Sequence, residues 1–190
     1  MDDRPLGPED ALLIVDVQKD FCPGGALAVE GGDEIIPVLN AWVREAVRRG
    51  ALVAASRDWH PPDHVSFHHR GGPWPPHCIR GTEGAEFHPD LELPKDAVIL
   101  SKAEAPHREA NSAFDGTGLA ELLRRRGVRR VFVGGLTQDV CVRATALDAL
   151  DLSLETVVLL DATRPVDPDQ GEAAAREMEA RGAKLLRGTP

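Results

Sequence analysis

Short, continuous apolar runs recur along the chain, separated by segments of a different periodicity. Four runs are rich in β-branched residues, which is typical of strands buried on both faces of a parallel sheet. They are ALLIVDV from Ala11, ALVAAS from Ala51, RVFVGG from Arg130 and ETVVLLD from Glu155. Two weaker runs, AVILSK from Ala97 and AKLLR from Ala183, bring the expected number of strands to about six.

Between these runs, apolar residues recur at helical spacing. The clearest segment, Glu34–Arg49, stops at Gly50, and glycine readily adopts the left-handed conformation in which many helices end. Similar patterns cover Gly118–Gly127, Gln138–Leu150 and Pro168–Arg181. Because strands and helices alternate, we expect an α/β fold, with a doubly wound, mostly parallel six-stranded sheet and helices on both faces in a Rossmann-like three-layer arrangement.

Two stretches interrupt this alternation. Gln18–Gly32 and the Pro-, His- and Gly-rich stretch Arg57–Asp96 show no clear periodicity, and long irregular segments inside compact domains usually have a function. No repeat, low-complexity tract or linker composition marks a second domain. At 190 residues the chain is short enough for one hydrophobic core, so we expect a single domain over residues 1–190.

Composition and charge narrow the class of protein. Apolar residues make up 42% of the chain and charged residues 28%, which is the balance of a folded globular protein. The net charge is -9 and arginines are interspersed with acids, so we expect no nucleic-acid partner. No apolar run approaches the roughly 20 residues that span a bilayer, and the acidic start MDDRPLGPED does not resemble an export signal. We therefore expect no membrane association.

The cysteine count bears on the compartment. Three cysteines are an odd number in a chain large enough to fold without disulfides, which suits a reducing environment. We expect a cytoplasmic protein that forms a homo-oligomer.

Four reactive side chains lie at the ends of successive expected strands: Asp16, Asp58, Lys102 and Cys141. Carboxyl ends of parallel strands share one edge of the sheet, and ligands bind there near the point where strand order reverses. Taken singly, each residue could be structural, because acids cap turns and cysteines pack as small hydrophobes. Asp16, however, interrupts an apolar strand and would be costly to bury without a partner, which Lys102 could provide.

Cys141 is the candidate nucleophile of this group. A free thiol with a pKa near 8.5 is only a few per cent ionised at neutral pH, so it needs a base or a pKa shift of about two units, roughly 2.7 kcal/mol. The first turn of the expected helix supplies about 0.3 to 1 kcal/mol through its dipole, which is too little. Asp16 could take the proton and Lys102 could stabilise the anion. We therefore predict a cysteine-dependent hydrolase.

Gly134 and Gly135 leave two interpretations open. They could form a tight turn whose N–H groups bind an oxyanion, or they could relieve close packing. No GxGxxG pattern follows a strand, which disfavours dinucleotide binding in the Rossmann manner.

The irregular stretch contains a carboxylate and imidazoles at short spacing. Asp58, His60, His64 and His77 offer the ligand types that suit zinc, iron or manganese, although seven histidines in the chain weaken the signal. Cys22 and Cys78 could join His77 in a structural zinc site, but no CxxC pair is present and both are better explained as packed thiols.

Five motifs around these residues occur in the order found in a known family. They are IVDVQKDFCPGGALAV around Asp16, RDWHPPDH around Asp58, WPPHC around His77, SKAE around Lys102 and GLTQDVCVRATALDA around Cys141. Over nearly its whole length, the chain resembles the isochorismatase-like cysteine hydrolase superfamily and, within it, the nicotinamidase/pyrazinamidase family.

This resemblance implies roles for individual residues. Asp16, Lys102 and Cys141 would form the catalytic triad, and the backbone N–H groups of Thr137 and Cys141 would form the oxyanion hole beside a cis peptide between Leu136 and Thr137. One divalent metal ion would be bound, with zinc as the first choice and iron or manganese as alternatives. The implied metal ligands are Asp58, His60, His77 and, in some family members only, His64; the implied substrate-binding residues are Phe21, Trp74 and Leu136.

The implied reaction is hydrolysis of a small-molecule carboxamide. Nicotinamide would give nicotinic acid and ammonia in NAD salvage, and pyrazinamide would give pyrazinoic acid, with the metal orienting the ring nitrogen. Thr137-Gln138, Ala103 and Asn111 depart from the commoner family residues, which leaves the substrate range open. The alternatives are a related amidase for carbamoyl or ureido compounds and, in a different class, a metal-binding or thiol-redox protein.

Overall fold

The structure is a computed structural model that describes residues 5–190; residues 1–4, the start of the acidic N-terminal stretch, lie outside the described part. Within residues 5–190 the chain forms one six-stranded sheet, and every strand pair in it is parallel. The strands are β1 (Asp10–Val15), β2 (Leu52–Asp58), β3 (Val98–Lys102), β4 (Arg130–Leu136), β5 (Glu155–Arg164) and β6 (Lys184–Leu186). All six expected strands are present, including the two weak ones.

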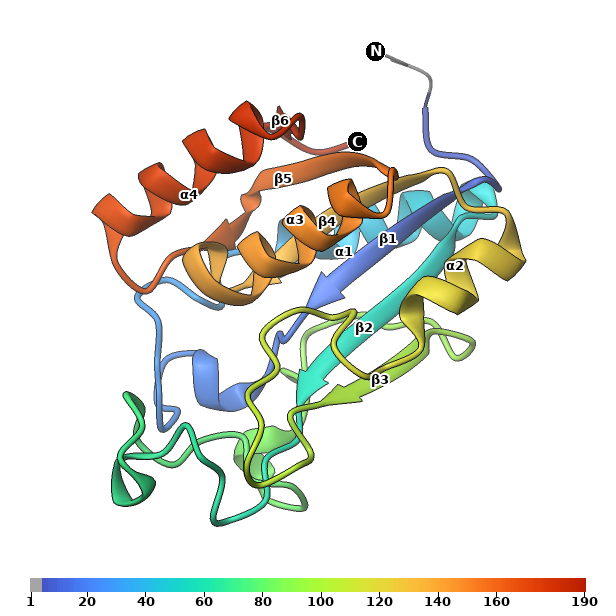
Figure 1. Cartoon of the computed structure of the whole chain (residues 1–190). Coiled ribbons are helices and arrows are strands. Elements are labelled where there is room, and N and C mark those ends of the chain that lie inside the picture. Colours follow the sequence, from blue (N-terminus) through green and yellow to red (C-terminus); the bar gives the residue numbers. More distant parts are fainter. Residues whose placement is uncertain (1–4) are drawn as a thin grey trace.

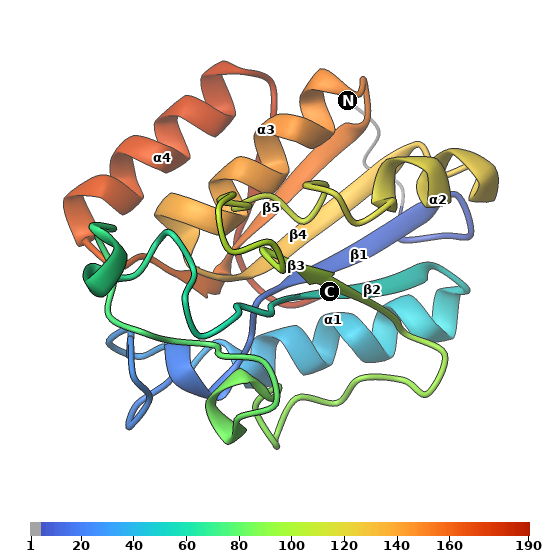
Figure 2. The ribbon, with the colours of Figure 1, turned by 60° about the horizontal axis from the view of Figure 1, so that its bottom comes forward.

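Four α-helices flank this sheet in the described part of the chain: α1 (Ile36–Arg49), α2 (Leu119–Arg126), α3 (Arg143–Asp151) and α4 (Pro168–Ala180). Helix α1 covers one face and α2, α3 and α4 cover the other (Figures 1 and 2). As expected, α1 ends at Gly50 in the left-handed conformation, with φ 73°. The doubly wound three-layer fold is confirmed. No helix within residues 5–190 has both the length and the apolar character to cross a bilayer.

The two faces of the sheet form two separate cores. Leu12 and Ile14 of β1 pack on the α1 side, whereas Leu13 and Val15 pack on the side of the other helices. All four are 2% exposed or less, because alternate residues of a strand point to opposite faces and both faces are covered. This double burial explains why β1 is a continuous apolar run.

The strand order β3-β2-β1-β4-β5-β6 places the reversal of winding between β1 and β4. Loops that follow β1 and β2 gather beyond the carboxyl ends of the strands (Figure 1). In open α/β sheets, ligands bind at this switch point. The fold therefore predicts one location for the site, and the reactive residues lie there.

Gly134 and Gly135 lie within β4 and not in a turn, so the turn interpretation is wrong for these two residues. Gly135 has φ 127°, and a Cβ atom built on it would lie 2.1 Å from the backbone oxygen of Val15. At this φ a Cβ atom would point into the backbone of the paired strand β1, so only glycine fits here. The packing interpretation explains this glycine.

Candidate active site

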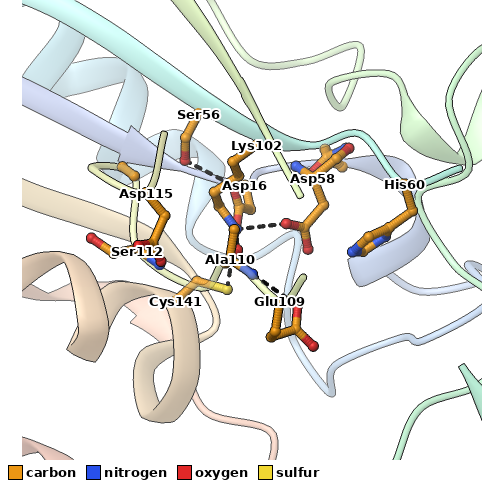
Figure 3. A network of polar contacts seen from close by, with 12 residues as sticks. Asp16, Ser56, Asp58, His60, Lys102, Glu109, Ala110, Ser112, Asp115 and Cys141 are labelled. Carbon is orange, nitrogen blue, oxygen red and sulfur yellow. Dashed lines mark hydrogen bonds and ion pairs between the residues drawn. The ribbon is translucent and has the colours of Figure 1, made fainter. Parts of the chain in front are cut away.

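Lys102 connects the reactive side chains at the switch point. Its Nζ atom lies 2.9 Å from Asp16 Oδ2, 2.5 Å from Asp58 Oδ1 and 3.6 Å from Cys141 Sγ. The four side chains come from the ends of β1, β2 and β3 and from the turn after β4, and they point toward one another (Figure 3). Lys102 is 1% exposed, so its contacts form in a medium of low polarity.

The charge of Lys102 is fixed by its two carboxylate neighbours. Burial alone would lower the pKa of Lys102, but Asp16 and Asp58 outweigh this effect and raise the pKa well above its usual value. Burial would likewise raise the pKa of Asp58, but Lys102 and then His60 keep it below its usual value. Lys102 is therefore a cation and Asp58 an anion at neutral pH.

Asp16 is placed to act as a base. It follows β1 directly with φ 49°, and its Oδ1 accepts a hydrogen bond of 2.7 Å from the Ser56 hydroxyl. Burial raises the pKa of Asp16 to about 6, with Lys102 opposing the rise. The carboxylate is thus mostly ionised at neutral pH and yet far more basic than an exposed aspartate.

Cys141 lies in a π-helical turn, Gln138–Val142, that precedes α3. Burial raises the pKa of Cys141 well above its usual value, and Lys102 only partly opposes this. The resting residue is therefore a thiol, and of the two routes weighed from sequence only the nearby base remains. In this turn the Thr137 carbonyl accepts N–H groups from Val140 at 3.3 Å and Val142 at 3.0 Å, the residues on either side of Cys141.

The peptide between Leu136 and Thr137 is cis, which confirms the expectation from the resemblance. Thr137 lines the pocket beside Cys141. The Leu136 side chain, in contrast, is fully buried in the core on the α1 side and is not among the lining residues. Contact between this side chain and a substrate is therefore not supported.

Asp58, His60 and His77 bring potential metal-binding atoms within 4.8 Å of one another, and all three are buried. The ring Nδ1 of His60 contacts the His77 carbonyl at 3.0 Å, and Nδ1 of His77 contacts the Pro75 carbonyl at 2.8 Å. Because a carbonyl oxygen only accepts, each Nδ1 must carry the proton, which leaves Nε2 as the ligand atom. Burial lowers the pKa of His60 to about 4, so this imidazole is neutral, as metal ligation requires.

The His64 ring lies against that of His60 at a tilt of 42°, with ring centroids 4.3 Å apart, but both of its nitrogens already have protein partners. Its Nδ1 accepts the Ser66 N–H at 3.3 Å and lies 2.7 Å from Ser66 Oγ, and its Nε2 contacts the Arg108 carbonyl at 2.9 Å. A second group of donor atoms, from His60, His64 and Glu109, also lies within 4.8 Å. Direct ligation by His64 therefore stays a prediction.

A pocket opens beside Cys141 and beside Asp58, His60 and His77, which we call the metal-type cluster. It contains the expected aromatic residues Phe21 and Trp74, and the Phe21 and His77 rings lie 5.5 Å apart. The full lining is Phe21, Leu27, Asp58, His60, Ser66, Trp74, His77, Glu109, Asn111, Thr137, Val140, Cys141 and Val166. Five lining residues were not identified from sequence: Leu27, Ser66, Glu109, Val140 and Val166. All but Val140 lie in loops, where no periodicity marks which side chain faces inward, and Val140 lies in a segment that was predicted as an ordinary helix.

The remaining cysteines match the interpretation as packed thiols. Cys22 and Cys78 are free and buried, and burial raises the pKa of Cys22 to about 11 and that of Cys78 well above its usual value. Neither belongs to a metal-type cluster in the described part of the chain.

Comparison with known proteins agrees with this geometry. Residues 10–189 match the Isochorismatase domain family. The nicotinamidase of Escherichia coli is 39% identical, with 94% of each chain covered. A solved pyrazinamidase of Pyrococcus horikoshii in complex with zinc is 52% identical, with a TM-score of 0.92 over 95% of this chain and 100% of that one. The solved structure of PnC1 from L. infantum in complex with nicotinate is 38% identical, with a TM-score of 0.89 over 97% of this chain and 96% of that one. The chain therefore belongs to the isochorismatase-like hydrolases and, within them, to the nicotinamidase/pyrazinamidase family.

Proposed function

We propose that this protein is a metal-containing cysteine amidohydrolase that converts nicotinamide to nicotinic acid and ammonia, and pyrazinamide to pyrazinoic acid. One observation supports this most directly: the Cys141 thiol and the Asp58, His60 and His77 cluster line the same pocket, together with two aromatic side chains. An aromatic amide could bind with its ring between Phe21 and Trp74 and its carboxamide at Cys141. The named relatives act on such compounds.

The first half-reaction begins with the buried thiol. Burial holds the pKa of this thiol well above its usual value, whereas the pKa of Asp16 is about 6, so full proton transfer before attack would be uphill. Transfer to Asp16 is therefore concerted with attack of Cys141 Sγ on the carboxamide carbon. The oxyanion is stabilised by the N–H groups of Thr137 and Cys141. Ammonia leaves after taking the proton back from Asp16, which gives a thioester.

The second half-reaction reuses the same base. Asp16 accepts a proton from water, the water attacks the thioester carbon, and Cys141 leaves and regains the proton. Lys102 stays charged throughout and keeps the Asp16 carboxylate oriented through the 2.9 Å ion pair. The products are the free carboxylic acid and the resting enzyme.

The residues present fit a divalent metal ion. Asp58, His60 and His77 form a buried set of one carboxylate and two imidazoles, which suits zinc first and iron or manganese as alternatives. A bound ion would supply Lewis acidity toward the ring nitrogen, directly or through water, and so would orient the substrate. We also propose a cytoplasmic homo-oligomer that acts in NAD salvage.

The deciding experiment is ammonia release from nicotinamide by purified protein, before and after chelation and after return of zinc, iron or manganese. We expect turnover that falls on chelation and returns with metal. No turnover with any metal would contradict the proposal. Turnover of a carbamoyl compound alone would instead favour the alternative function, a related amidase for carbamoyl or ureido compounds. The chain is also similar to a solved N-carbamoylsarcosine amidase from Thermoplasma acidophilum, with a TM-score of 0.78 and 29% identity.

A further inference from the structure

Gln18 is a fully buried amide that no step of the proposed reaction uses. It lies two residues after Asp16, in the turn that follows β1, and its N–H donates to the Asp16 carbonyl at 2.8 Å. Its side chain reaches sideways to the end of β2. A buried amide of this size is stable only when its donors and acceptor are satisfied, so its partners reveal what it does.

All partners of the Gln18 side chain are backbone groups. Oε1 accepts the Asp58 N–H at 2.8 Å, and Nε2 donates to the Asp58 carbonyl at 2.8 Å and to the Ala85 carbonyl at 2.9 Å. One side chain therefore satisfies both backbone groups of Asp58.

The sheet explains why Asp58 needs this partner. The β1–β2 ladder ends with Val15 opposite Ser56 and a last bond from the Asp16 N–H to the Ser56 carbonyl at 3.1 Å. Residues two apart in a strand direct their backbone groups to the same side, so Asp58 also faces β1, but the chain has turned away there. The Gln18 amide takes the place of the missing peptide group of β1.

We infer that Gln18 is a positioning residue that fixes the backbone of Asp58 and thereby preorganises the metal site. This inference rests on the proposed role of Asp58 as a metal ligand. Lys102 binds Asp58 Oδ1 at 2.5 Å, so the aspartate is fixed at its backbone by Gln18 and at its carboxylate by Lys102. The bond to Ala85 connects the same amide to the short helix Glu83–Ala85, in the segment that follows His77. Gln18 thus links the end of β2, which contributes Asp58, to the segment that follows His77.

The chain offers a matched control in Asn40 on α1. This amide is also buried, and it bridges backbone groups in the same manner: Nδ2 donates to the Asp90 carbonyl at 2.8 Å and Oδ1 accepts the Glu92 N–H at 2.9 Å. Neither partner belongs to the metal-type cluster. Loss of either amide leaves buried backbone groups without hydrogen-bond partners, so removal of Gln18 or of Asn40 should lower the stability of the fold. Only removal of Gln18 frees the backbone of Asp58.

The test compares zinc binding by chelator-treated wild type, Gln18→Met and Asn40→Leu, using competition with a chromophoric chelator, alongside the melting temperature of each metal-free protein. Removing an outer partner of a metal ligand typically costs about 10- to 100-fold in affinity. We expect both variants to melt at lower temperature and Gln18→Met alone to lose zinc affinity by that factor. Gln18→Asn, which keeps the amide but is one carbon shorter, should lose affinity in the same direction and serves if Gln18→Met does not fold.

Zinc affinity within twofold of wild type in Gln18→Met or Gln18→Asn would overturn the inference, as would an equal loss in Asn40→Leu. Because no amide substrate is used, failure of the nicotinamidase proposal leaves this comparison intact. Failure of the wild type to bind zinc would remove both the metal site and the positioning role.

Discussion

At the scale of residues, the site depends on the balance of charge around Lys102. Two carboxylates, one ammonium group and a thiol lie together at 7% exposure or less. Separate burial of such charges would be expensive, so each must be paired. The pairing is unequal, because it lowers the pKa of Asp58 while that of Asp16 rises to about 6. This difference assigns the base role to Asp16 and leaves Asp58 as the permanent anion beside the histidines.

Substitution of the nucleophile separates chemistry from metal binding. Cys141→Ala removes the attacking sulfur, so we expect turnover to fall by at least about 10⁴-fold. The metal-type cluster of Asp58, His60 and His77 is left intact, so metal content measured on the purified variant should match wild type. His60→Ala should instead lose the metal. Turnover retained by the Cys141 variant would refute covalent catalysis.

The pH dependence of kcat/KM reports the ionisation of Asp16. Because the carboxylate form accepts the proton, activity should rise with pH through about 6, where Asp16 ionises. Ser56 donates a hydrogen bond to the ionised form, so Ser56→Ala should raise the pKa of Asp16 and move the acid limb to higher pH. One hydrogen bond of about 1 kcal/mol corresponds to a shift of about 0.7 units.

Ser101→Ala is the control for this profile. The Ser101 hydroxyl accepts from Arg57 Nε at 2.9 Å and has no bond to Asp16. Its acid limb should coincide with that of wild type. An acid limb in Ser56→Ala that is unmoved or shifted to lower pH would contradict the assignment of Asp16 as the base.

At the scale of elements, the parallel pairing of β1 with β4 brings the base and the nucleophile together. Gly135→Ala would place a Cβ atom 2.1 Å from the Val15 oxygen at φ 127°, so backbone strain and overpacking should lower the free energy of unfolding by about 2 to 5 kcal/mol. Gly127→Ala is the matched control, because its φ is 68° and no atom lies within 4 Å. It should cost only about 1 to 2 kcal/mol. The free energy of unfolding of both variants can be measured by urea titration. An equal loss in Gly135→Ala and Gly127→Ala would show that the contact of residue 135 with β1 is unimportant for stability.

The helices and strands also show which parts of the fold sequence patterns are sufficient to predict. Double burial makes β1 a continuous apolar run, and Gly50 ends α1, so strands and helices could be predicted within a few residues. The segment Gln138–Leu150 was predicted as one helix, but it begins with a π-helical turn. That turn depends on tertiary contacts, in which the Asp139 carboxylate accepts the N–H groups of Val166 at 3.0 Å and Asp167 at 3.2 Å. Periodicity does not encode such contacts.

At the scale of the whole molecule, the rule that ligands bind at the carboxyl ends of parallel strands located the reactive residues. It did not locate the residues that hydrogen-bond to them and hold them in place. Asp16, Lys102 and Cys141 were identified because reactive residue types at strand ends are unusual. Ser56 and Gln18 were not, because a serine in a strand and a glutamine in a loop are ordinary until the fold shows what they contact. The carbonyl of Ala110, which accepts from Lys102 at 3.0 Å, has no side-chain signal at all.

Metal binding should stabilise the whole fold, because the proposed ligand atoms come together only when the chain is folded. Asp58 ends β2, whereas His77 lies well inside the irregular stretch that follows it. A ligand that binds only the folded state at about 100 times its Kd adds about 2.7 kcal/mol. For a chain of this size that corresponds to a rise in Tm of roughly 5 to 10 °C.

Scanning calorimetry of metal-free wild type with and without zinc should show this rise. Cys141→Ala should keep it and His60→Ala should lose it, because only His60 belongs to the Asp58 and His77 cluster. An equal rise in His60→Ala would mean that zinc binds elsewhere on the protein.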